Sequence, residues 1–183
     1  RQLMGYRLAE TIKQQLTPEQ LASIDAVIPI PETSLISAYA VSKHLKIPYC
    51  QGFVKNRYIF RTFIMPNQKA RQKGVRAKLN AIPIEFQDKN VLLVDDSIVR
   101  GTTSREIVLM AKEAGAKQVF FASCAPPITY AHIYGIDLAS SSELIAHHSS
   151  SQDIARKIGA DAVVYQSLKD LEESCAEASP RPD

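Results

Sequence analysis

The chain has 183 residues, of which 45% are hydrophobic and 22% are charged, and its formal net charge is +3. These values fit one compact soluble domain, and the lack of any apolar run of about 18 residues excludes a transmembrane helix from our expectations. Three cysteines without a CxxC pair argue against a disulfide framework or a four-thiolate metal site and favour free thiols in a reducing cytoplasm. Because residues 1–5 carry neither an initiator methionine nor a signal-peptide pattern, we expect the sequence to be part of a longer protein.

Short apolar segments alternate with helical patterns along the chain. Leu8, Ile12 and Leu16 recur every fourth residue and predict a first amphipathic helix. A buried strand is then expected at residues 26–30 and another strand at 49–54. Between them, residues 34–45 are predicted to form a helix, with these side chains facing inward: Leu35, Ile36, Tyr39 and Leu45.

The strongest strand pattern is the apolar run at residues 91–94, which is typical of a strand covered on both faces. A helix should follow, because Thr103 and Glu106 have the spacing of a capping box and Gly115 suits the C′ position. Further along we expect strands at 118–124 and 162–165, helices at 153–158 and 167–175, and a tail at 176–183. This alternation predicts an open α/β fold with a mostly parallel sheet and helices on both faces.

Positive charge is concentrated in one segment. Between residues 55 and 78 no acidic residue interrupts eight basic ones: Lys55, Arg57, Arg61, Lys69, Arg71, Lys73, Arg76 and Lys78. Of the 22 Lys and Arg residues, 14 remain elsewhere against 19 acidic residues, a net charge of −5. A local anion site therefore fits better than a basic face over the whole domain, and sparse aromatic residues argue against an RNA-binding patch. The region from Arg57 to residue 81 also lacks periodicity, and so long a connection is often a functional lid.

The residues after the strand at 91–94 carry the candidate chemistry, because ligands of open α/β sheets lie beyond the carboxyl ends of strands. Gly101 permits a close approach of the backbone to an anion, and Ser97, Thr102 and Thr103 offer hydroxyl donors beside a helix N-terminus. The paired carboxylates that precede them, Asp95 and Asp96, would repel a phosphate but suit a ribose diol or Mg²⁺. An ordinary helix entry capped by Asp and Ser is the alternative, and it leaves this crowding of acids, glycine and hydroxyls unexplained.

Residues 91–103, with the sequence VLLVDDSIVRGTT, resemble the phosphoribosyl-pyrophosphate (PRPP) motif of type I phosphoribosyltransferases. Within that superfamily, the chain most resembles the phosphoribosyltransferase domain of glutamine PRPP amidotransferases. The resemblance extends over residues 1 to about 175 and is supported by the segments IPIPETS at 28–34, GFVKNRY at 52–58, RTFIMP at 61–66, YGID at 134–137 and ELIAH at 143–147.

The resemblance implies a role for each matching residue. The 5-phosphate of PRPP would contact a loop and helix start formed by Ser97, Arg100, Gly101, Thr102 and Thr103. Asp95 and Asp96 would bind the ribose hydroxyls and help to hold Mg²⁺. The turn at residues 31–34 would bind pyrophosphate, with Glu32 and Thr33 in contact with PRPP and Thr33 also near the metal. A flexible catalytic loop at residues 55–78 would order over PRPP, with contacts from Lys55, Arg57, Tyr58 and Lys78.

The implied reaction is displacement of Mg-pyrophosphate from PRPP by ammonia, giving 5-phosphoribosylamine, the first committed intermediate of purine biosynthesis. We expect a cytoplasmic enzyme with AMP or GMP as feedback ligands, a homo-oligomeric full-length form, and neither nucleic-acid nor membrane partners. The family's N-terminal glutaminase domain, with its catalytic cysteine, has no counterpart in these 183 residues, so free ammonia is the expected nitrogen source.

The sequence departs from the family pattern at two positions, and two other functions are possible interpretations. Phe60 and Gly74 replace a small residue and a serine expected in the flexible loop, and they bear on catalytic competence. A phosphoribosyltransferase acting on a purine or pyrimidine base is one alternative, although no segment is evident for a base-binding hood. A non-catalytic module that senses PRPP or nucleotides is the other.

Overall fold

The computed structural model describes residues 1–56, 75–131 and 140–179. Its centre is a parallel four-stranded sheet with the order β1 (Ala26–Pro29), β4 (Asn90–Asp95), β5 (Gln118–Ser123) and β6 (Ala162–Tyr165). Pro29 pairs with Val94, Val94 with Ala122 and Ala122 with Val164. The carboxyl ends of all four strands therefore lie along one edge of the sheet.

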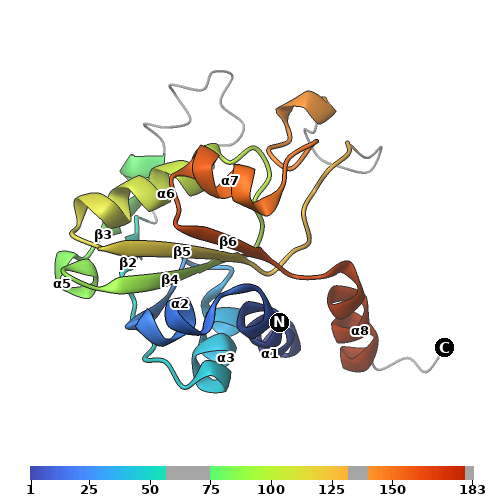
Figure 1. The fold of residues 1–183 in the computed structure, drawn as a ribbon, viewed down its shortest axis with the longest axis horizontal. Coiled ribbons are helices and arrows are strands. Elements are labelled where there is room, and N and C mark those ends of the chain that lie inside the picture. The colour runs from blue at the N-terminus through green and yellow to red at the C-terminus, as the bar shows by residue number, and fades with distance from the viewer. Residues whose placement is uncertain (57–74, 132–139, 180–183) are drawn as a thin grey trace.

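Helices cover both faces of this sheet (Figure 1). One face carries α1 (Gln2–Gln15), α2 (Pro18–Ser23) and α3 (Leu35–Leu45), and the other carries α6 (Thr102–Glu113) and α7 (Ser151–Ile158). Alternate strand residues serve the two layers: Leu92 packs toward α1 and α3, whereas Leu93 packs toward α6 and α7. The predicted α/β class with a mostly parallel sheet is confirmed. None of the helices in the described ranges is long and apolar enough to cross a membrane.

A second sheet was not predicted from the sequence. β2 (Phe53–Lys55) pairs antiparallel with β3 (Leu79–Ala81), and the Asn56 amide donates a hydrogen bond to the Lys78 carbonyl at 2.7 Å. The predicted strand at 49–54 is thus displaced, because only Tyr49 bridges to β1 before the ladder begins at Phe53. The short helix α5 (Pro83–Phe86) follows β3. This hairpin-like sheet joins the two ends of the basic segment, whose residues 57–74 lie outside the described ranges.

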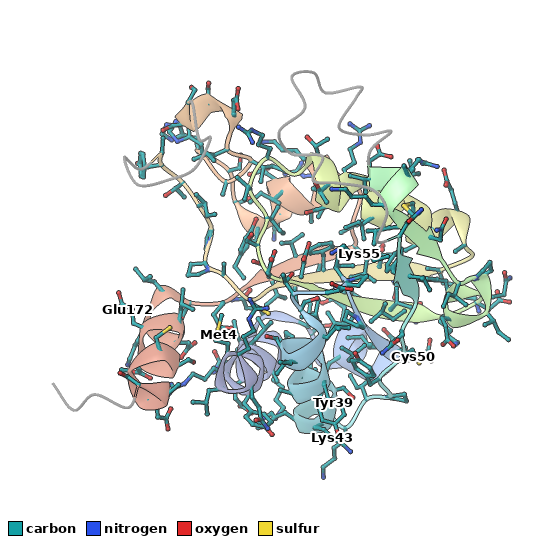
Figure 2. All side chains as sticks on the ribbon, turned by 180° about the vertical axis from the view of Figure 1, so that it is seen from behind. Met4, Tyr39, Lys43, Cys50, Lys55 and Glu172 are labelled. Atoms are coloured by element: carbon teal, nitrogen blue, oxygen red, sulfur yellow. The ribbon has the colours of Figure 1, made fainter. Side chains whose placement is uncertain are left out.

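The inward face predicted for α3 is wrong in part. Ile36 and Tyr39 are 56% and 50% exposed, and the buried positions are mostly small residues such as Ser37 and Ala40. The reason is the close approach of α1, where a Cβ on Gly5 would lie 2.7 Å from the Ala40 Cβ. Only small side chains fit between helices this close. Tyr39 and Lys43 instead lie on the outer face of α3, with the ammonium 5.5 Å from the ring centroid (Figure 2).

The two ends of α6 differ in how well they follow the sequence pattern. Gly115 has a φ of 101° directly after the C-cap Ala114, which confirms the predicted C′ glycine. The predicted capping box is wrong: the N-cap is Gly101, and Glu106 binds the Arg76 guanidinium at 3.1 Å. The spacing of Thr103 and Glu106 could not predict this partner of Glu106, because Arg76 lies far away in the sequence, near the end of the basic segment.

The C-terminal helix α8 (Leu168–Ala178) lies against α1. Arg7 of α1 forms ion pairs with Glu173 and with Glu177, the latter at 2.9 Å. Helical structure therefore continues to Ala178, three residues into the region expected to be a tail.

Candidate active site

The loop between β4 and α6 contains a glycine that no other residue could replace without strain. Gly101 has a φ of 75°, in the left-handed region that side chains with a Cβ disfavour. A Cβ at this position would also overlap the Cδ1 atom of Ile145. The sequence predicted a close backbone approach at Gly101, and the structure adds a hydrophobic side chain that occupies one side of it.

Because the N-cap of α6 is a glycine, the capping residue has no side chain to bond the N–H groups of the first helical turn. Thr102 is half-buried and Thr103 is exposed at the start of this turn, and Ser97 is half-buried earlier in the loop. Unfilled N–H groups, the helix dipole and nearby hydroxyls together form a site suited to a phosphate. The part of the site predicted to bind the 5-phosphate is thus assembled by local geometry.

The two aspartates at the end of β4 differ sharply in environment. The Asp95 side chain is buried and its Oδ1 accepts a 2.8 Å hydrogen bond from the Asp96 amide, whereas Asp96 is exposed. The Ser97 hydroxyl lies 3.3 Å from Asp96 Oδ1 and donates to it. Burial is the main cause that raises the pKa of Asp95 to about 8; the adjacent carboxylate of Asp96 adds to the shift, and the hydrogen bond from the Asp96 amide opposes it.

We expect the stability of the metal-free protein to fall as the pH rises from about 4 to about 8, through the contribution of Asp95. The folded state holds the Asp95 proton up to its raised pKa, whereas the unfolded chain releases it near 3.8. Stability from this group is therefore complete below pH 4 and is lost progressively up to pH 8. Asp95→Asn should remove the dependence and raise the free energy of unfolding at pH 8 by several kcal/mol. Urea unfolding in EDTA at pH 5 and pH 8 measures both effects, and equal pH dependence in the two proteins would contradict them.

The turn predicted to bind pyrophosphate follows β1, the strand that neighbours β4. Glu32 and Thr33 are exposed there, while the Ser34 hydroxyl donates a hydrogen bond to the Ile30 carbonyl and holds the turn. The Arg1 guanidinium donates to the Thr33 carbonyl. Since parallel strands end at the same edge, the turn and the Asp95–Asp96 pair open toward the same side of the sheet.

Of the four residues predicted to contact PRPP from the basic segment, two lie in the described ranges. Lys55 ends β2 (Figure 2), and its ammonium lies 3.5 Å from Glu32 Oε2, which links the basic segment to the pyrophosphate turn. Lys78 is half-buried beside the Asn56–Lys78 backbone hydrogen bond. Arg57 and Tyr58 lie outside the described residues, as do the departures Phe60 and Gly74.

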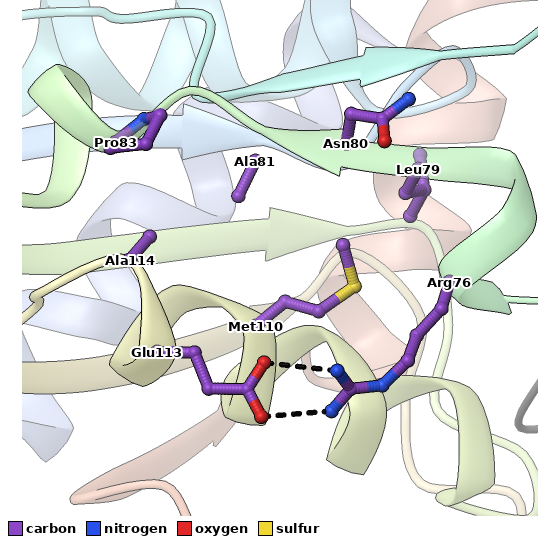
Figure 3. Close-up of a pocket in the computed structure, with 8 residues that line it drawn as sticks. All are labelled: Arg76, Leu79, Asn80, Ala81, Pro83, Met110, Glu113 and Ala114. Carbon is purple, nitrogen blue, oxygen red and sulfur yellow. Dashed lines mark hydrogen bonds and ion pairs between the residues drawn. The ribbon is translucent and has the colours of Figure 1, made fainter.

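Arg76 has a different role from the one that its place in the basic cluster suggested. Its guanidinium forms two 3.0 Å hydrogen bonds with the Glu113 carboxylate (Figure 3), and its Nε donates a third bond to Glu106. These carboxylates raise the pKa of Arg76, so its charge is fixed and largely compensated. It borders a groove of about 310 Å³ at the C-terminal end of α6, away from Gly101, which is lined by Arg76, Leu79, Asn80, Ala81, Pro83, Met110, Glu113 and Ala114.

Sequence reasoning missed two further features of this edge. Arg100 Nε donates a 2.7 Å hydrogen bond to Glu143 Oε2, forming an ion pair between residues far apart in the chain. Gln166 follows β6 with only 1% of its surface exposed, and its amide atoms find no hydrogen-bond partner among the described residues. Glu143 belongs to the segment at 143–147 that supported the family resemblance, so the sequence did mark this residue. Nothing in the sequence around Gln166 distinguishes it.

No group of three or more His, Cys, Asp or Glu side chains in the described part of the chain is placed to hold a metal ion by itself. Asp95 and Asp96 are nevertheless adjacent carboxylates at the carboxyl edge of the sheet. A cation there would be shared with oxygens of a bound molecule or water, as is common for Mg²⁺.

Comparison with known proteins decides the family. Residues 6–150 match the model of the phosphoribosyl transferase domain. The chain belongs to the phosphoribosyl transferase domain family. The fold and the motif at residues 91–103 agree with this assignment, and the resemblance inferred from the sequence is confirmed.

Two curated relatives of this phosphoribosyl transferase domain are amidophosphoribosyltransferases. The chain is 57% identical over 175 residues to the amidophosphoribosyltransferase of Schizosaccharomyces pombe, covering 96% of this chain and 33% of the relative. It is 55% identical over 177 residues to the amidophosphoribosyltransferase of Escherichia coli, covering 97% of this chain and 34% of that protein. The domain thus spans about a third of the length of the curated relatives that it matches.

A solved structure of a glutamine PRPP amidotransferase is also similar to this chain in its fold. Glutamine PRPP amidotransferase from Bacillus subtilis, in complex with ADP and GMP, aligns with a TM-score of 0.77 and 39% identity. The alignment covers 98% of this chain and 39% of that chain. The match therefore extends over nearly the whole phosphoribosyl transferase domain.

Proposed function

We propose that the chain transfers the 5-phosphoribosyl group of PRPP to ammonia, giving 5-phosphoribosylamine and pyrophosphate, the first committed step of purine biosynthesis. The observation that carries this proposal is the arrangement after β4, where a buried and an exposed carboxylate precede an uncapped helix start at Gly101. The names of the relatives support the choice of reaction.

Each part of PRPP has a proposed set of contacts. The 5-phosphate binds the N–H groups at the start of α6 and the side chains of Ser97, Arg100, Thr102 and Thr103. Asp95 and Asp96 accept hydrogen bonds from the ribose hydroxyls. The pyrophosphate lies against Glu32 and Thr33, with Lys55, Arg57, Tyr58 and Lys78 supplying contacts from the basic segment.

The carboxylate pair also fits Mg²⁺, the metal implied by the family. Two adjacent carboxylates, one of them with a pKa raised by burial and by its neighbour, form a site where a divalent cation would offset the unfavourable charge. Asp95 and Asp96 would hold the ion, with the Thr33 hydroxyl as a third candidate. When bound, Mg²⁺ neutralises charge that develops on the departing pyrophosphate.

The proposed step needs no protein nucleophile. The bond between C1 and the pyrophosphate oxygen breaks, and the electron pair leaves with pyrophosphate. The ammonia nitrogen forms the new bond to C1 and releases a proton. The carbon has oxocarbenium character between these events, as in other glycosyl transfers, so fixing the ribose hydroxyls at Asp95 and Asp96 is the main task of the protein.

One assay separates this proposal from the alternatives. The protein is incubated with PRPP and Mg²⁺, then supplied in turn with ammonia, glutamine or free purine and pyrimidine bases, and pyrophosphate release is followed. We expect release with ammonia and none with glutamine or bases. Release only with a base would support a base phosphoribosyltransferase, and PRPP binding without turnover would support a sensing module.

Purine nucleotides are proposed as competing ligands of the same site. The Bacillus subtilis relative was solved with ADP and GMP bound. A nucleoside monophosphate shares the ribose 5-phosphate of PRPP, so the phosphate-binding helix start and the carboxylate pair can serve both molecules. AMP or GMP should therefore raise the PRPP concentration needed for half-maximal activity.

A further inference from the structure

Residues 140–148, here called the brace segment, lie against the outer side of the loop that is proposed to bind the 5-phosphate. The Ile145 amide donates a hydrogen bond to the Val99 carbonyl at 3.0 Å. Glu143 Oε2 accepts the 2.7 Å hydrogen bond from Arg100 Nε. The Ile145 side chain fills the space that a Cβ on Gly101 would need. Three consecutive loop residues are therefore each contacted by this segment.

The brace segment is itself held firmly. Leu144 and Ala146 are each only 3% exposed, so the backbone on both sides of Ile145 is anchored in the core. His147 Nδ1 lies 2.7 Å from the Thr129 carbonyl, and the Ser141 hydroxyl oxygen accepts a 3.1 Å hydrogen bond from the Ala131 amide. These contacts connect the segment to the chain that leaves β5. The loop after β4 is thus supported from the direction of the neighbouring strand.

A carboxylate this close to a phosphate site needs an explanation. Glu143 would repel a phosphate if it stood alone, but its charge is compensated by Arg100, whose side chain is only 18% exposed. The pair consequently adds little net charge to the site. The effect of Glu143 is therefore geometric: it holds the partly buried Arg100 guanidinium, which is proposed to contact the 5-phosphate, and with it the backbone of the residue directly before Gly101.

We propose that Glu143 is a positioning residue for PRPP binding, which acts through Arg100 to hold the loop so that the N–H groups after Gly101 converge on the phosphate. Ile145 supports the same loop through its contacts with Val99 and Gly101. The expected effect on PRPP binding rests on the proposed function. The support that the brace segment gives to the loop does not, because it is present in the unliganded protein.

The test compares Glu143→Gln, Arg100→Gln and the double variant, with Glu172→Gln on α8 as a control that removes one exposed carboxylate elsewhere (Figure 2). In unliganded protein, hydrogen exchange of a peptide spanning residues 96–103 should be about fivefold faster in Glu143→Gln, the effect expected of one modest ion pair. The dissociation constant for PRPP with Mg²⁺ should rise by a similar factor of about five, whereas kcat at saturating PRPP stays within about twofold. The dissociation constant of the double variant should be no higher than that of the single variant that binds PRPP more weakly. The two losses should not add, because Glu143 acts through Arg100.

Wild-type exchange and wild-type PRPP affinity in Glu143→Gln would overturn the inference. So would a double variant whose loss equals the product of the two single losses. If Glu143→Gln fails to fold, Ile145→Val must accelerate exchange at residues 96–103, and unchanged exchange there would also overturn it. A wild-type protein that does not bind PRPP would refute the proposed function alone, because the exchange comparison needs no ligand.

Discussion

Replacing Asp95 and Asp96 together by asparagine should weaken Mg²⁺-dependent PRPP binding by at least about 100-fold, because each charge-assisted hydrogen bond contributes roughly 1.5–3 kcal/mol. Asparagine keeps the size of each side chain and can still accept the bond from the residue 96 amide. It removes the charge that would hold Mg²⁺ and the strong acceptors for the ribose diol. Isothermal titration with PRPP, with and without Mg²⁺, measures the loss.

Two controls make this result interpretable. Glu172→Gln changes an exposed carboxylate on α8 and should leave PRPP affinity unchanged. The double variant should also be no less stable than the wild type at pH 8, because the asparagine at the buried position 95 carries no charge. Lost binding would then reflect the site and not unfolding. Unchanged affinity in the double variant would refute the assignment of sugar and metal to these aspartates.

Gly101→Ala should lower the free energy of unfolding by about 2–5 kcal/mol, combining left-handed backbone strain of about 1–2 kcal/mol with overpacking of about 1–3 kcal/mol. The φ of 75° supplies the first cost, and the overlap with Ile145 Cδ1 supplies the second. PRPP affinity should fall as well, since relief of the overlap moves either the brace segment or the helix start. Urea denaturation and PRPP titration of the variant measure both effects.

Gly159 offers a matched control for that substitution. Its φ is 78°, but an added Cβ would meet only Val108 Cγ1 at 4.0 Å, an ordinary contact. Gly159→Ala should therefore show the backbone cost of about 1–2 kcal/mol alone, with PRPP binding intact. Equal destabilisation by the two substitutions would show that the contact between Gly101 and Ile145 carries no energetic weight.

The parts of the fold that the sequence predicted are those determined by neighbouring residues. The apolar run at 91–94, the glycine at 115 and the alternation of strands and helices each report local burial or local backbone conformation, and the structure confirms them. The crowding of acids, hydroxyls and Gly101 after β4 was also evident, because the whole helix start lies within nine consecutive residues.

The parts that the sequence did not predict depend on residues distant in the chain. The pairing of β2 with β3 joins segments on either side of the basic region, and Arg76 reaches Glu106 and Glu113 on α6. Glu143 pairs with Arg100, from which it is separated in the sequence by α6 and β5. The outward face of α3 is likewise set by the closeness of α1 at Gly5, which no periodicity within α3 encodes. Each of these contacts arises only once the elements have packed.

The central claim, that residues 95–103 form a Mg²⁺-dependent PRPP site, is tested most directly by mapping where PRPP protects the backbone. Hydrogen exchange with mass spectrometry on the wild-type protein, with Mg²⁺ and with or without PRPP, locates the protected peptides. We predict slowed exchange in peptides covering residues 95–103 and 31–34, and no such change when EDTA replaces Mg²⁺. Protection confined to the groove bordered by Leu79 and Met110, or none at residues 95–103 under saturating PRPP, would contradict the account.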